Sequence, residues 1–115
     1  MSLEIESTAG CTPRACTPRA CGVTDAWNVV GDRWTLLVLH ELFLGVHRFS
    51  DIQANTGAPR SSVSMRLRKL ERAGLVVRQR YCERPPRDEY VLTPAGQAMG
   101  PALRELQAWG ETYAR

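Results

Sequence analysis

Hydrophobic residues recur at helical spacing from about Thr24 to Gly74, alternate with polar residues from Leu75 to Leu92, and return to helical spacing after Pro94. Capping residues and glycines divide the helical part into four segments and mark their ends. The second segment is apolar around most of its circumference, which indicates a buried helix. The predicted helices are 24–31, begun by Thr24 or Asp25; 33–44; 51–55, capped by Ser50; and 60–73, closed by Gly74.

The alternating part predicts two antiparallel strands, 75–81 and 88–92, joined by a basic, proline-containing turn over 83–87. Thr93 and Pro94 then supply an N-cap and a first-turn proline for a single C-terminal helix. The expected fold is therefore mainly α with a small antiparallel β-hairpin.

The last helix carries an apolar stripe that is longer than the core of a 115-residue chain readily covers. We expect part of this stripe to lie at a subunit interface. Its members are Met99, Leu103, Leu106, Trp109 and Tyr113.

The fourth helix is amphipathic in an unusual way, because its outer face is basic. Val63, Leu67 and Leu70 share one side when the segment is wound at helical period. The opposite side carries Ser61, Ser62, Met65, Arg68, Lys69 and Arg72. One face is expected in the core, and the other is available to a partner.

Charge along the chain is strongly uneven, although the whole chain carries only +3. Residues 60–87 hold nine basic groups against Glu71 and Glu83, a local net charge of +7, whereas the remaining residues sum to −4. A basic stripe of this kind is typical of a surface that neutralises phosphates, and from charge alone it is equally consistent with a solvated face.

The order of these elements favours the phosphate-binding interpretation. Three short helices, then a helix with a basic face that Gly74 closes, and then a hairpin with arginines at its tip are the parts of a winged helix-turn-helix. We expect the helix over 60–73 to enter the major groove and the wing over 75–92 to contact the backbone or the minor groove of double-stranded DNA. The predicted base readers are Ser61, Ser62 and Met65, and the predicted phosphate contacts are Arg60, Arg68, Lys69, Arg72, Arg84 and Arg87.

Several segments resemble the HxlR-type regulators, relatives of the MarR group. They include 29–37 with its Gly31-Asp32-Arg33-Trp34 run, Arg48-Phe49, 66–70, the Pro85-Pro86-Arg87 wing and 92–94. The resemblance runs from about Cys21 to Gly110. It implies a homodimer built from the first and last helices, which would bring Trp27 to the interface, and binding to a pseudo-palindromic operator.

The first 22 residues form a separate segment, read as an extended or mobile arm ahead of a domain over 23–115. Pro13 and Pro18 lie in tandem Cys-Thr-Pro-Arg-Ala repeats and work against a helix there. The resemblance implies an oxidant or electrophile sensor at Cys21, although a glycine follows it where the family commonly has proline. Cys11 and Cys16 leave three alternatives open: a disulfide with Cys21, a soft metal site completed by Cys82, or ordinary thiols.

Other classes of protein are less compatible with this sequence. No His, Asp or Asn arrangement suggests activation of a thiol nucleophile, so we expect no enzyme. We also expect no cofactor, and no metal site beyond the alternative left open for the cysteines. The longest apolar run, 36–39, is too short to span a bilayer, and the acidic start lacks the features of a secretory signal, which predicts a cytoplasmic protein. A protein-interaction module remains the main alternative to a DNA-binding regulator, with a small molecule or an oxidant as effector.

Overall fold

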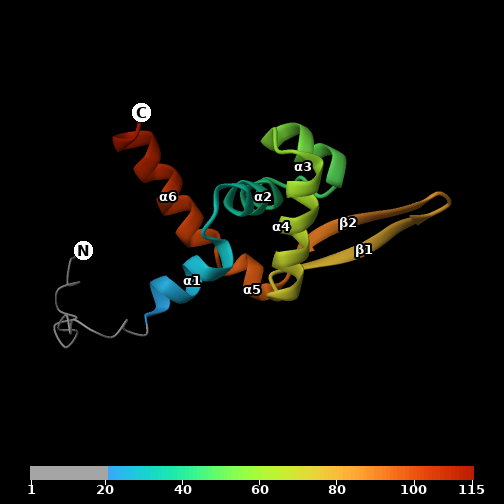
Figure 1. The fold of residues 1–115 in the computed structure, drawn as a ribbon, viewed down its shortest axis with the longest axis horizontal. Helices are drawn as coiled ribbons and strands as arrows, with labels where there is room; N and C mark the ends of the chain where they lie inside the picture. The colour runs from blue at the N-terminus through green and yellow to red at the C-terminus, as the bar shows by residue number, and fades with distance from the viewer. Residues whose placement is uncertain (1–20) are drawn as a thin grey trace.

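Residues 21–115 are described by a computed structural model, in which a central group of helices carries a projecting hairpin on one side (Figure 1). The hairpin points away from the side where the first and last helices lie (Figure 1). In chain order the elements are α1 (Gly22–Val30), α2 (Arg33–Phe43), α3 (Phe49–Thr56), α4 (Arg60–Arg72), β1 (Val76–Glu83), β2 (Pro86–Leu92), α5 (Pro94–Gln97) and α6 (Gly100–Tyr113). The predicted fold class is confirmed.

The core is built mainly by α2, α3 and α4, and Val76, the first residue of β1, is buried with them. Leu67 and Leu70 of α4 are buried against α2, so the predicted inner face of this helix is confirmed. Ile52 brings α3 into the same cluster. The other fully buried side chains are Thr35, Val38, Leu39, Val63 and Val76, and Leu42 is nearly so. This burial fixes the orientation of α4 and leaves its opposite side in solvent.

Gly74 turns the chain from α4 into the hairpin. Its φ of +85° is a left-handed conformation that glycine adopts without strain, as the sequence predicted. The amide of Leu75 then donates to the carbonyl of Leu70 at 3.0 Å, which closes the last turn of the helix. As a result β1 starts directly from the end of the basic helix.

Two helix starts differ from the prediction. α1 begins at Gly22, ahead of Thr24 and Asp25, because the carbonyl of Cys21 already accepts from the amide of Asp25 at 3.0 Å. α3 begins at Phe49, so Ser50 lies inside the helix and does not cap it. The reason is tertiary: the backbone of His47 is bonded to Tyr90 of β2, which keeps the chain extended until the helix begins.

The wing is longer and its turn is tighter than predicted. β1 and β2 pair from Val76 opposite Leu92 to Glu83 opposite Pro86, with an irregularity at Tyr81. Only Arg84 and Pro85 form the turn. Arg87 therefore belongs to β2, opposite Cys82, and does not lie in the turn.

The C-terminal region is two helices, although a single one was predicted. Thr93 does cap the start, since its Oγ1 accepts from the amide of Gly96 at 3.1 Å. The helix breaks after Gln97 because Pro101 has no N–H to continue the ladder and its ring would clash with the turn before it. α6 then starts afresh, in a new direction (Figure 1).

α1 and α6 lie on the side of the molecule away from the wing (Figure 1), and both helices expose large apolar side chains. Trp27 is 61% exposed, and Leu106, Trp109 and Tyr113 are also exposed. Leu103 and Met99 differ from the rest of the predicted stripe, because Leu103 is only 8% exposed and lies in the core of its own chain, and Met99 is half-buried against that core. None of the helices within residues 21–115 has the length and apolar character needed to cross a membrane.

Candidate nucleic-acid interface

The outer face of α4 combines small polar, apolar and basic side chains near the beginning of the helix. Pro59 precedes the helix with extended backbone, and its carbonyl accepts from the amides of Ser62 and Val63. Ser61 is exposed in the first turn and Ser62 is half-buried beside it. Met65 follows one turn later and is 54% exposed. These three side chains lie in the first half of α4, where the sequence predicts contacts to base edges.

Arginines surround these residues, and local contacts hold two of them. Arg60 lies over the ring of Phe49, with 4.9 Å between its guanidinium carbon and the ring centroid. Arg68 donates from Nη2 to Ser64 Oγ at 3.1 Å. Arg72 is exposed in the last turn. The face therefore carries positive charge at its start, middle and end, and local contacts hold the first two of these arginines.

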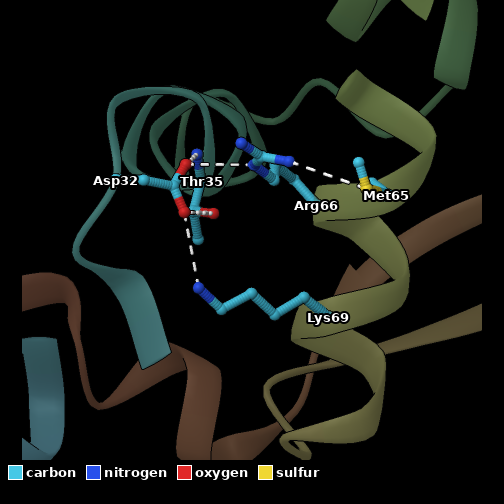
Figure 2. A network of polar contacts seen from close by, with 5 residues as sticks. All are labelled: Asp32, Thr35, Met65, Arg66 and Lys69. Carbon is cyan, nitrogen blue, oxygen red and sulfur yellow. Dashed lines mark hydrogen bonds and ion pairs between the residues drawn. The ribbon is translucent and has the colours of Figure 1, made fainter. Parts of the chain in front are cut away.

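Two further cations of α4 turn toward the protein (Figure 2). Arg66 Nε lies 3.0 Å from Asp32 Oδ1, and Lys69 Nζ lies 3.4 Å from Asp32 Oδ2. Lys69 was predicted to hold a phosphate, but here its ammonium group is bonded to a carboxylate of the same chain. Sequence periodicity missed this because Lys69 lies at the border between the buried and exposed faces.

Asp32 is also the N-cap of α2. Its carboxylate accepts from the amide of Thr35 at 2.9 Å and from Thr35 Oγ1 at 2.7 Å. Partial burial opposes ionisation, but the hydrogen bonds from Thr35, Arg66 and Lys69 outweigh it and hold the pKa of Asp32 well below its usual range. The carboxylate is therefore charged and joins the start of α2 to the middle of α4.

The wing divides its arginines in a similar way. Arg78 and Arg80 both pair with Asp88 across the hairpin, at 3.9 and 3.0 Å. Arg84 and Arg87 are exposed near the tip, and no ion pair found within residues 21–115 involves either of them. Positive charge that is available to a partner is therefore concentrated at the tip.

A hollow of about 430 Å³ separates the wing from the starts of α3 and α4. Three arginines from three different elements or loops line the hollow: Arg48, Arg60 and Arg87. Asp51 and Asp88 line it as well. Arg48 lies over the ring of Tyr81 at 4.7 Å, which joins the loop before α3 to the wing. The remaining lining residues are Phe49, Ser50 and Tyr81. Charge counting missed Arg48 because it precedes the basic segment, and its only signal was its place in the family resemblance.

The two described cysteines are free and lie in different parts of the fold. Cys21 immediately precedes α1, where the backbone N–H groups of Thr24 and Val23 lower the pKa of its thiol. Cys82 is in β1 and its Sγ lies 3.6 Å from the carbonyl oxygen of Arg84. Within residues 21–115 no three His, Cys, Asp or Glu side chains come together as a metal site would require. Cys11 and Cys16 lie outside the described residues.

A helical unit whose basic last helix runs into a two-stranded wing defines a winged helix-turn-helix domain. The chain belongs to the HxlR-like helix-turn-helix family, whose family model matches residues 29–115. The resemblance drawn from the sequence is thereby confirmed. Members of this family regulate transcription by binding DNA and are not enzymes.

The similarity of the chain to individual relatives supports its membership of this family. An uncharacterized HTH-type transcriptional regulator of Mycobacterium tuberculosis is 47% identical over 88 residues, which are 76% of this chain and 56% of that protein. The chain therefore spans little more than half the length of that relative. A solved structure of the redox regulator HypR in its oxidized form has a TM-score of 0.74 and 29% identity, covering 80% of this chain and 96% of that one. A MarR-family regulator from Enterococcus faecalis has a TM-score of 0.70 and 35% identity, covering 90% and 94%.

Proposed function

We propose that the chain is a cytoplasmic, sequence-specific transcription regulator that binds double-stranded DNA as a homodimer. The observation that carries this proposal is the exposed face of α4 together with the arginines of the wing, since Arg60 of α4 and Arg87 of the wing line the same hollow. Membership of a helix-turn-helix family supports it independently. In this arrangement α4 enters the major groove, and the wing tip contacts the backbone or the minor groove.

Each part of the interface has a distinct role in the proposal. Ser61, Ser62 and Met65 read base edges, since they lie in the first half of α4. The arginines position the protein on phosphates, and any of them that meets a guanine contributes to specificity as well. They are Arg60, Arg68 and Arg72 on α4 and Arg84 and Arg87 on the wing, with Arg48 added by the geometry of the hollow. Lys69 is left out of this set, because Asp32 engages it.

A homodimer formed through α1 and α6 completes the proposal. Trp27, Leu106, Trp109 and Tyr113 would be covered by the second copy, which explains why such large apolar groups are exposed in one chain. A two-fold symmetric dimer matches a pseudo-palindromic operator with half-sites about one helical turn apart.

The same proposal includes a response to oxidants or electrophiles at Cys21. A lowered thiol pKa increases the thiolate fraction, and the thiolate is the reactive species. The likeness to HypR, a redox regulator, supports this part. Because Cys21 precedes α1, its oxidation would change the proposed dimer interface. A change at that interface would in turn affect the DNA-binding unit.

The test is binding to the DNA upstream of the protein's own gene, measured by gel shift against unrelated competitor DNA, with and without reductant. We expect a preference for the upstream DNA that weakens steeply as salt rises, and release by oxidant that Cys21→Ser abolishes. Binding without sequence preference would overturn the regulator proposal. Salt-insensitive association with a protein would favour an interaction module, and an intact oxidant response in Cys21→Ser would exclude Cys21 as the sensor.

A further inference from the structure

One feature of the fold lies beside the proposed interface without belonging to it: the cluster formed by Asp32, Thr35, Arg66 and Lys69 (Figure 2). We propose that Asp32 is a positioning residue for specificity, which keeps Arg66 and Lys69 away from DNA phosphates and fixes the side chains around Met65. The inference rests on the DNA-binding function proposed above. It adds a residue that touches no DNA but sets the balance between specific and non-specific binding.

Hydrogen bonds from Thr35 hold the carboxylate of Asp32 in place. Thr35 is completely buried and donates twice to Asp32, once from its amide and once from its hydroxyl group. Each of the two carboxylate oxygens therefore has one bond to Thr35 and one to a cation of α4. A carboxylate anchored in this way restricts both cations to the inner edge of the helix.

The consequence for DNA binding follows from charge. A cation that neutralises a phosphate releases counterions and strengthens binding to any sequence. Arg66 and Lys69 lie on the same helix as Arg68 and Arg72, so in the absence of Asp32 their flexible side chains are free to swing toward the DNA backbone. Asp32 thereby limits the sequence-independent part of the affinity.

A second consequence concerns Met65, a proposed base reader. The guanidinium group of Arg66 that binds Asp32 through Nε also lies 4.0 Å from the sulfur of Met65 through Nη1 (Figure 2). Met65 is exposed and intrinsically flexible, so this contact restricts where its thioether group lies. Loss of Asp32 would release Arg66 and with it the constraint on Met65. Specific binding would weaken while non-specific binding strengthens.

The variant that tests the inference is Asp32→Asn, because asparagine is as good an N-cap as aspartate but lacks the charge. We expect tighter binding to unrelated DNA and a steeper dependence of log K on log salt, by about 0.9 for each additional phosphate that the protein neutralises. We also expect a lower ratio of operator to unrelated affinity. Unchanged binding to unrelated DNA together with an unchanged salt slope would overturn the inference.

A matched control is Glu41→Gln, which removes one carboxylate from the same helix. Glu41 accepts a hydrogen bond from Asn55 and has no cation among the ion pairs found within the described chain. Its salt slope should equal that of the unsubstituted protein. The double variant Asp32→Asn/Arg66→Gln should show a smaller increase in slope than Asp32→Asn alone, since one freed cation is absent; an equal increase in both variants would contradict the role given to Arg66.

A measurement on the unsubstituted protein avoids any effect on folding. Lys69 is the only lysine in the chain, so its ammonium group gives a single lysine side-chain resonance in isotope-labelled protein. We expect this resonance to be observable without DNA and to stay in place when unrelated DNA is added. A large shift would mean that Lys69 leaves Asp32 for a phosphate, against the inference. Failure of the unsubstituted protein to prefer its operator would instead contradict the proposed function.

Discussion

Replacing Arg68 by alanine is the most direct test of the surface through which α4 is proposed to bind DNA. Its guanidinium group is exposed and bonded to Ser64 Oγ at 3.1 Å, so it is held on the outer face of the helix. A direct contact of this type contributes about 1–3 kcal/mol. A homodimer presents two copies, which gives an expected loss of about 2–6 kcal/mol for the operator. Since about 1.4 kcal/mol is tenfold, Kd should rise at least about 25-fold.

The assay is fluorescence anisotropy on operator and unrelated duplexes over a series of salt concentrations. If Arg68 contacts a phosphate, affinity falls on both duplexes and the salt slope decreases by about 0.9 per phosphate. If Arg68 reads a guanine, the loss is larger on the operator. Arg115→Ala is the control, because it removes the same charge at the C-terminus, away from the wing (Figure 1). Identical titrations for Arg68→Ala and Arg115→Ala would refute the interface.

Three further predictions concern stability and assembly. Leu67→Ala should lower the free energy of unfolding by about 2–5 kcal/mol in urea titrations, because Leu67 is 1% exposed; a loss near zero would contradict its place in the core. Trp109→Glu should shift sedimentation toward monomer, and an undisturbed dimer would remove α6 from the interface. Asp32 has a lowered pKa in the folded state, so its stabilisation is complete above the unfolded pKa of about 3.9 and is lost as the pH falls below it. Thermal unfolding of Asp32→Asn should therefore be less acid-sensitive than that of the unsubstituted protein, and equal sensitivity would count against the ion pairs.

Local patterns were sufficient for elements whose ends are set within their own segment. α4 was predicted to within one residue because Val63, Leu67 and Leu70 mark its buried side and Gly74 ends it with a left-handed turn. The cap at Thr93 was equally local, since its hydroxyl group accepts from an amide three residues later.

Elements whose ends depend on distant segments were predicted less well. The start of α3 is set by the pairing of His47 with Tyr90, more than forty residues away, and Ser50 gave a false local signal. The break before α6, by contrast, follows from a local signal, because Pro101 prevents the single continuous helix that the apolar periodicity predicts. Leu103 carries the same periodicity as its exposed neighbours, so spacing alone could not separate core from interface.

The charge of the candidate interface could not be predicted from the basic segment alone either. Counting along the sequence assigned nine basic groups to residues 60–87, with only Glu71 and Glu83 to oppose them. In the folded chain two other carboxylates do most of the neutralising: Asp32, from the start of α2, holds Arg66 and Lys69, and Asp88, within the wing, holds Arg78 and Arg80. The arginines left free lie where a groove-bound helix and a wing tip would meet phosphates. Folding therefore converts a uniformly basic segment into a surface with charge at particular points, and a surface of that kind can favour one DNA register over another, which a uniform stripe cannot do.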